Sequence, residues 1–344
     1  MQLPREVVVG NGTLDLVLPI CKKLGFSDGA FVVTGPKTFE IAASRIIDEL
    51  KDSGISTDYL FVSSSTMEEV EAVEARIQEI RPQVVLGVGG GTKIDVAKLS
   101  SARKDTPFMS IPTAASHDGI ASPFTSVKGA NQHYSIIAEA PMAVIADTSI
   151  IVKASHRYTA SGCGDVISKH TAVRDWYLAH RVKDEYYGEY AASLALMSAK
   201  LVAKNAELIK PGNEKGLRVL LEALISCGVA MSIAGSSRPC SGSEHLFSHA
   251  LDLIAPNNAL HGEQTGVGTI LMACLQGSNW RRIKSKLEKV GSPTTAKELG
   301  VESQDIIDSL VRARQIRPER YTILNEKVLT EKTATKLAKK TRVI

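Results

Sequence analysis

The chain has 344 residues, about twice the size of a common single domain, so we expect two domains, each with its own core. Its 44% hydrophobic and 23% charged residues are typical of a folded globular protein and exclude a disordered or collagen-like chain. The net charge of +4 is too small to indicate a nucleic-acid partner.

The positive charge is concentrated near the end of the chain. Residues 281–344 carry 16 basic and 8 acidic side chains, whereas the rest of the chain has an acidic excess. Lysines spaced along helical segments are typical of a solvated helix surface. We favour that interpretation over a polyanion-binding patch.

The cysteines and the first residues of the chain indicate the cellular compartment in which the protein is expected. The five cysteines are scattered, odd in number and without a Cys-x-x-Cys pair, which argues against a disulfide framework. The first twelve residues include Arg5 and Glu6 but no apolar core of a signal peptide. No apolar run approaches the ~20 residues of a membrane span. We therefore expect a cytoplasmic protein that does not span a membrane.

The region 1–150 alternates short β-branched runs with amphipathic segments. This alternation predicts an α/β domain with a mostly parallel sheet and crossover helices over 38–51 and 66–80. A turn at Lys128–Asn131 between two short alternating runs predicts a β-hairpin within 122–137. The predicted strands are 7–9, 31–34, 59–63, 84–88, 108–111 and 143–146.

The region 151–344 shows helical patterns and no further strand signals. We therefore expect an all-α C-terminal domain, which excludes an evenly built (β/α)₈ barrel. The clearest predicted helices are 161–180, 189–209, 216–233, 243–253 and 263–276.

A glycine-rich turn follows the strand predicted at 84–88. Gly89, Gly90 and Gly91 allow a ligand to approach the backbone, and Thr92 is a plausible N-cap with Asp95 three residues later. Free N–H groups at a helix start suit a phosphate anion. The spacing differs from the G-x-G-x-x-G fingerprint and from a Walker A loop, so a purely structural turn stays open as an alternative.

A second polar loop, over 112–122, follows the next predicted strand. Ligands of open parallel sheets bind beyond the carboxyl ends of the strands. The two loops together therefore predict the edge of a coenzyme crevice, although a solvated connection would have the same composition.

Metal-ligating residues gather in the helical region. Asp165 is expected in the first turn of a helix, His245 and His249 lie four residues apart on one helix face, and His261 lies in the loop before the next helix. From spacing alone, His245 and His249 would share one ion. One carboxylate and two imidazoles would leave a tetrahedral ion an open position for a substrate.

Five motifs in order now resemble one family. They are GGGTKIDVAK (89–98), PTAASHDG (112–119), SGCGDVISK (161–169), GSEHLFSH (242–249) and LHGEQTGVG (260–268). The chain is similar to the archaeal-type sn-glycerol-1-phosphate dehydrogenase family, within the superfamily of iron-containing alcohol dehydrogenase, glycerol dehydrogenase and dehydroquinate synthase. The resemblance implies a dehydroquinate synthase-like fold divided into domains 1–150 and 151–344.

The resemblance also implies site residues. One Zn²⁺ per chain would be held by Asp165, His245 and His261, with His249 facing the substrate instead of the metal. Asp118 and His249 would be catalytic, and Asp118, Asp165 and His249 would contact the substrate. Coenzyme contacts would fall on Gly89, Gly90, Gly91, Thr92, Lys93, Ile94 and Asp95, on Thr113, Ala114, Ala115 and Ser116, and on Ser122.

The activity implied is the reversible NAD(P)H-dependent reduction of dihydroxyacetone phosphate to sn-glycerol 1-phosphate, the backbone of archaeal ether phospholipids. We expect a homo-oligomer, and we consider Lys169, His170 and Arg174 as partners of the substrate phosphate. Lys37 and Thr38, with no acid near them, favour use of both NADH and NADPH. The alternatives are a glycerol or polyol dehydrogenase, a dehydroquinate synthase-like lyase, or a non-catalytic nucleotide sensor.

Overall fold

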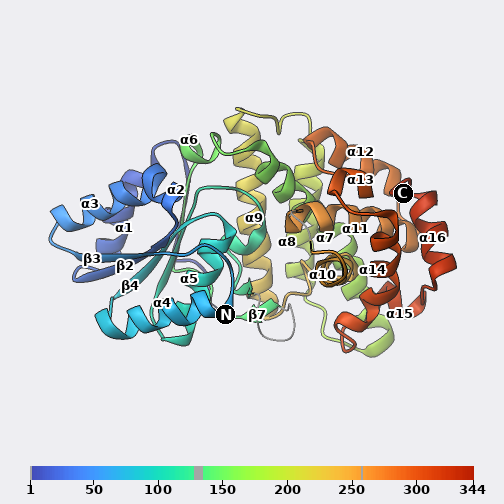
Figure 1. Ribbon diagram of the computed structural model, residues 1–344, viewed down its shortest axis with the longest axis horizontal. Coiled ribbons are helices and arrows are strands. Elements are labelled where there is room, and N and C mark those ends of the chain that lie inside the picture. Colours follow the sequence, from blue (N-terminus) through green and yellow to red (C-terminus); the bar gives the residue numbers. More distant parts are fainter. Residues whose placement is uncertain (1, 128–134, 257–258) are drawn as a thin grey trace.

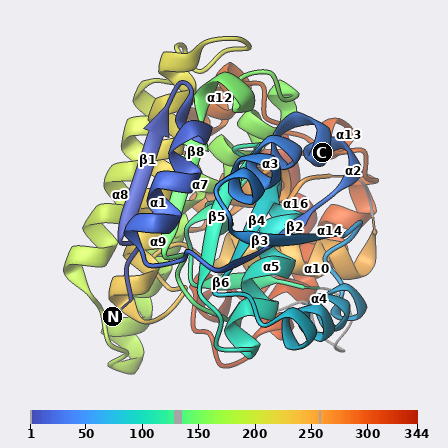
Figure 2. The ribbon, with the colours of Figure 1, turned by 90° about the vertical axis from the view of Figure 1, so that its left-hand side faces the viewer.

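Six parallel strands form the sheet of the computed structural model, which describes residues 2–127, 135–256 and 259–344 (Figure 1). The strand order is β1-β8-β5-β4-β2-β3, and every pair that is hydrogen-bonded in this sheet is parallel (Figure 2). All six predicted strands are present, which confirms the α/β class. Their bounds are β1 Glu6–Gly10, β2 Gly29–Thr34, β3 Ser56–Phe61, β4 Val84–Gly89, β5 Phe108–Pro112 and β8 Ala143–Asp147.

The sheet is buried on both faces because alternate side chains of one strand enter different cores. Val84 and Leu86 pack in the core that contains the apolar side chains of α1 and α3, whereas Val85 packs in the core that contains those of α4 and α5. This explains why the strands are continuous apolar runs. The elements of this part are η1 Thr13–Leu16, α1 Val17–Lys23, α2 Pro36–Thr38, η2 Phe39–Ala43, α3 Ser44–Asp52, α4 Met67–Ile80 and α5 Gly91–Arg103.

The helix predicted over 38–51 is interrupted. It consists of the short α2, a five-residue π-helical stretch η2 and then α3. The sequence analysis missed this change of helix type because the apolar spacing continues through it.

The predicted β-hairpin is present as a separate two-stranded sheet. Strand β6, Phe124–Ser126, pairs antiparallel with β7, Ser135–Ile137. The turn predicted at Lys128–Asn131 lies outside the described residues. A short helix, η3 (Asp118–Ile120), precedes the hairpin on the loop that leaves β5.

The described residues after Asp147 form helices and contain no strand, as predicted (Figure 1). Apart from α6, which lies by the sheet, they form the central and right-hand part of the molecule in Figure 1. Their bounds are α6 Thr148–Ile151, α7 His156–Lys183, α8 Glu189–Lys204, α9 Glu214–Ala234, α10 Ser243–Ile254, α11 His261–Leu275, α12 Trp280–Val290, α13 Ala296–Leu299, α14 Ser303–Ile316, α15 Ile323–Glu326 and α16 Glu331–Lys340.

Helix α9 is the one described helix with the length and apolar composition needed to cross a membrane. In its most apolar window, however, 61% of the residues are buried inside the protein, and its side chains form part of the main core. These are properties of a core helix.

The basic end of the chain forms helices α12 to α16, and the lysines of α16 are exposed, in agreement with a solvated helix surface.

Candidate active site

A cavity of about 990 Å³ lies where the carboxyl ends of the strands meet the helical part. Its wall is formed by the turn after β4, the loop after β5, the hairpin, the start of α11 and one side of α10. The size is that of a site for a cofactor or small ligand. Its position beyond the strand ends agrees with the crevice expected from the sequence.

The glycine-rich turn starts α5 in the cavity wall. The N-cap is Gly90, so the predicted N-cap at Thr92 is wrong: Thr92 already lies in the first helical turn. Gly90 has φ −78° and nothing lies within 4 Å of the position that a Cβ would occupy. The first N–H groups of a helix have no acceptor within it. This turn therefore provides open space beside backbone donors, which suits a pyrophosphate.

Nine of the twelve residues expected to bind the coenzyme line this cavity. The other three, Gly89, Ile94 and Ala115, do not: Gly89 is the buried end of β4, and the side chains of Ile94 and Ala115 lie in the core. These three support the turn from behind. The nine that line the cavity are Gly90, Gly91, Thr92, Lys93, Asp95, Thr113, Ala114, Ser116 and Ser122.

Lys98, one turn after Asp95 on α5, was given no role by the sequence analysis. Lys98 is fully buried, and its ammonium donates to the carbonyl oxygens of Gly119 at 2.6 Å and Phe124 at 2.8 Å, which fixes η3 and the hairpin on α5. The Asp95 Oδ1 atom is buried without a hydrogen-bond partner and lies 3.6 Å from the Lys98 ammonium. Such an orphaned acceptor in the cavity wall fits a polar ligand.

The proposed metal ligands come from three helices. Donor atoms of Asp165 (α7), His245 (α10) and His261 (α11) all lie within 4.8 Å of one another. His249 is not in this group, and its ring stacks on that of His261 with centroids 6.1 Å apart. Helix spacing favoured His245 and His249 as the two imidazole ligands. Among the described residues, however, the cluster contains His245 and His261.

Two positions differ from expectation. Asp165 lies well inside the 28-residue helix α7, not in a first turn, and His261 is the first residue of α11. The glycines around Asp165 suggested a helix start. They instead allow another backbone to approach: a Cβ on Gly164 would lie 2.1 Å from the Gly262 oxygen, and one on Gly262 would lie 1.9 Å from the Ser161 oxygen.

Electrostatics favour metal binding at this cluster. Burial lowers the pKa of both His245 and His261, so both imidazoles are neutral and can act as ligands. Burial alone would raise the pKa of Asp165, but the adjacent Lys169 ammonium holds it below its usual range. The Glu244 carboxylate lies 2.8 Å from His245 Nδ1, which leaves Nε2 facing Asp165 at 3.7 Å.

Lys169 is a buried centre of charge beside the cluster. Its ammonium lies 2.6 Å from Asp165 Oδ1 and 2.8 Å from Asp118 Oδ2, and the Asp118 N–H donates to Asp165 Oδ2. The Lys169 ammonium is therefore already paired with two carboxylates. Lys169, His170 and Arg174, the expected phosphate partners, are absent from the cavity wall, and Arg174 is exposed.

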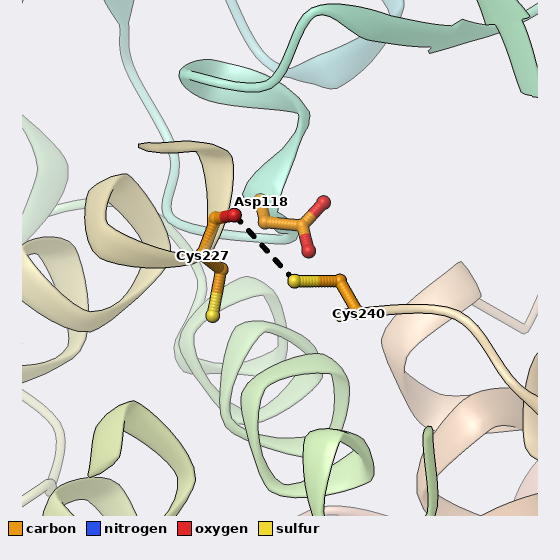
Figure 3. A group of neighbouring side chains, drawn as sticks. All are labelled: Asp118, Cys227 and Cys240. Atoms are coloured by element: carbon orange, nitrogen blue, oxygen red, sulfur yellow. Dashed lines mark hydrogen bonds between the residues drawn. The ribbon is translucent and has the colours of Figure 1, made fainter. Parts of the chain in front are cut away.

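Asp118 has a second set of neighbours, which the sequence analysis missed. Donor atoms of Asp118, Cys227 and Cys240 lie within 4.8 Å of one another, and the Cys240 thiol donates to the Cys227 carbonyl oxygen at 3.5 Å (Figure 3). Burial raises the pKa of the Cys240 thiol well above its ordinary value. A metal here would need deprotonated thiols, whereas the Asp165 cluster has its ligands in the required protonation state.

Comparisons with known proteins agree with this geometry. A family model described as iron-containing alcohol dehydrogenase matches residues 8–155. The solved structure of glycerol dehydrogenase from Schizosaccharomyces pombe superposes with a TM-score of 0.82 at 20% identity, covering 99% of this chain and 89% of that one. The fold is thus that of the dehydroquinate synthase-like proteins.

Sequence relatives narrow this class to one family. Glycerol-1-phosphate dehydrogenase [NAD(P)+] from Pyrococcus furiosus is 55% identical, covering 100% of this chain and 99% of the relative. The protein of the same name from Methanosarcina mazei is 53% identical, covering 100% of this chain and 96% of the relative. The chain belongs to the glycerol-1-phosphate dehydrogenase family, as its motifs predicted.

Proposed function

We propose that this protein is an NAD(P)H-dependent oxidoreductase that reversibly reduces dihydroxyacetone phosphate to sn-glycerol 1-phosphate for archaeal ether phospholipid synthesis. The observation that carries the proposal is one cavity whose wall includes both a helix-start turn suited to a pyrophosphate and the imidazoles of His245 and His261, which share a donor cluster with the buried Asp165. The names of the full-length relatives support the substrate.

We assign the metal to Asp165, His245 and His261, and we propose Zn²⁺, one per chain. A carboxylate with two neutral imidazoles suits this ion and leaves a position for substrate. When bound, zinc supplies a Lewis acid for the ketone oxygen, and the coenzyme supplies the hydride.

The chain itself must then deliver one proton to the oxygen of the substrate. We assign this role to His249, which lines the cavity next to the His261 ring and is 6% exposed. Histidine is suited to move a proton near neutral pH. Asp118 also lines the cavity, and its carboxylate is fixed by Lys169, so we assign it the orientation of a substrate hydroxyl.

The coenzyme would bind with its pyrophosphate at Gly90, Gly91 and Thr92. The cavity continues past Lys37 and Thr38, next to Lys93, and the Lys93 side chain packs against Gly35. Lys37 and Lys93 supply cations for a 2′-phosphate, so we propose that both NADH and NADPH are used.

The assay that tests this function uses zinc-loaded protein with NADH or NADPH and dihydroxyacetone phosphate, followed by chiral analysis of the product. We expect stoichiometric coenzyme oxidation and formation of sn-glycerol 1-phosphate. Equal rates with unphosphorylated dihydroxyacetone would favour a polyol dehydrogenase, and absence of net coenzyme turnover would favour a lyase.

We also propose a cytoplasmic location and a homo-oligomer. The five cysteines are free, and four of them are buried, which suits a reducing compartment. Light scattering coupled to size-exclusion chromatography measures the oligomeric state directly, and a single-chain mass would contradict the oligomer.

A further inference from the structure

The segment between α9 and α10 forms one wall of the cavity. Ser237, Cys240 and Ser241 of this segment line the cavity together with His249, a turn and a half into α10. Ser237 and Ser241 lie outside the sequence motifs and have no role in the function proposed above. Both residues are largely buried, 4% and 8% exposed, so their hydroxyls are held in place.

A buried arginine supports this wall from behind. Arg320, in the connection between α14 and α15, is 8% exposed and does not line the cavity. It donates from Nη1 to the Ser241 carbonyl oxygen at 2.6 Å and from Nη2 to Ser237 Oγ at 2.8 Å. Because Ser237 Oγ is an acceptor for Arg320, the proton of this hydroxyl is available for a ligand.

The charge of Arg320 has no close partner in the described parts of the chain. No carboxylate there lies within 4.0 Å of its guanidinium, whereas the neighbouring Arg238 is paired with Glu185. Burial, Arg317 and Arg238 lower the pKa of Arg320 to about 9, and the carboxylates of Glu185 and Glu244, both beyond 4.0 Å, offset only part of this shift. A buried cation without a counterion is costly, and an anion on the other side of Ser237 would offset that cost.

We propose that Ser237 and Ser241 form the subsite for the phosphate group of the substrate, with Arg320 as the positioning residue that orients Ser237 and supplies the positive charge. This inference rests on the proposed function, because it places the phosphate of a triose phosphate in the cavity of the metal cluster. Ser241 lies four residues before His245 and shares the cavity wall with His249, which keeps the phosphate end near the reacting carbon.

Other cations of the cavity wall lie elsewhere. Lys37 and Lys93 flank the turn proposed for the coenzyme. Lys153 follows α6 and is exposed, so its ammonium is hydrated and contributes little to specific binding. Lys153 is therefore the rival phosphate partner that the experiment must include.

The experiment compares steady-state kinetics of zinc-loaded Ser237→Ala, Arg320→Met, Arg320→Lys and Lys153→Met with two substrates, dihydroxyacetone phosphate and dihydroxyacetone. Loss of a hydrogen bond to a charged group predicts a KM for dihydroxyacetone phosphate about tenfold higher in Ser237→Ala, and about a hundredfold higher in Arg320→Met. Arg320→Lys should recover part of this loss. The KM for dihydroxyacetone and both kcat values should stay within about twofold.

The matched control is Arg314→Met, which removes an exposed arginine of the nearby helix α14 and should change neither KM. An unchanged KM for dihydroxyacetone phosphate in Ser237→Ala and Arg320→Lys, or an equal rise for both substrates, would overturn the subsite. A higher KM for dihydroxyacetone phosphate in Lys153→Met alone would also overturn the subsite.

Failure of the proposed function has a different signature. If the wild-type protein does not reduce dihydroxyacetone phosphate, the function is wrong, and inorganic phosphate then tests the subsite by itself. The subsite predicts that phosphate raises the Tm of the wild-type protein and of Arg314→Met, but not that of Ser237→Ala. Equal shifts in all three proteins would overturn it.

Discussion

Replacement of Gly90 by valine separates coenzyme binding from every other property of the site. Among the described glycines, Gly90 alone combines a negative φ with empty space within 4 Å of its Cβ position. A valine is therefore compatible with the backbone, and we expect the free energy of unfolding to change by less than about 0.5 kcal/mol. By contrast, a Cβ on Gly91 would lie 1.9 Å from His117 Nε2.

The added side chain occupies the space that we assign to the pyrophosphate. Loss of one charge-assisted hydrogen bond costs about 1.5 to 3 kcal/mol, so the Kd for NADPH should rise roughly 10- to 150-fold. Gly90→Ala, which adds a single carbon, should show a smaller rise. The proposed metal ligands lie on other elements, so zinc per chain should stay the same.

The assay is titration of NADPH fluorescence with each variant, combined with zinc analysis after dialysis and thermal unfolding followed by circular dichroism. A folded, zinc-containing Gly90→Val protein with the wild-type Kd would refute the reasoning. In that case, the turn is purely structural and the pyrophosphate binds elsewhere.

Three further predictions concern the helical part. His249→Ala should retain zinc and lose about a hundredfold in kcat, whereas His261→Ala should lose the metal; the reverse pattern of zinc per chain would favour the spacing interpretation. Gly262→Ala places a Cβ 1.9 Å from the Ser161 oxygen, so we expect a Tm lower by at least several degrees, and an unchanged Tm would contradict the close contact. Burial and nearby cations lower the pKa of His170 to about 4, so the unfolded chain binds more protons between pH 6.5 and 4 and stability falls as the pH decreases. Between pH 6.5 and 4, the free energy of unfolding measured by urea titration should fall by about 2 to 3 kcal/mol less in His170→Gln than in the wild type. Equal decreases in the two proteins would show that His170 is not the cause.

The strands were predictable because a parallel sheet covered on both faces needs continuous apolar runs, such as 84–88. Helix type and helix starts were less predictable. The glycines around Asp165 suggested a helix start, yet here they serve contact between helices, and the π-helical stretch Phe39–Ala43 keeps a helical apolar pattern.

Within the site, the resemblance supplied candidates that spacing alone misassigned. Residues four apart on one helix, such as His245 and His249, share a face, but only the packing of α11 against α10 brings His261 to His245. Roles that depend on contacts between segments far apart in the sequence could not be predicted from local patterns. Arg320 reaches Ser237 across 83 residues of sequence, and no local pattern records such a contact.

The glycine contact between α7 and α11 has a consequence for how tolerant the metal cluster is to change. Asp165 follows Gly164, and His261 precedes Gly262, so two of the three ligands are adjacent to the place where the main chains of the two helices touch. Their separation is thus set by incompressible backbone atoms and not by interdigitated side chains that can adopt other rotamers. Apolar substitutions in the surrounding core should change the melting temperature far more than the affinity for the ion. During divergence, this core can drift in composition while the coordination geometry stays constant.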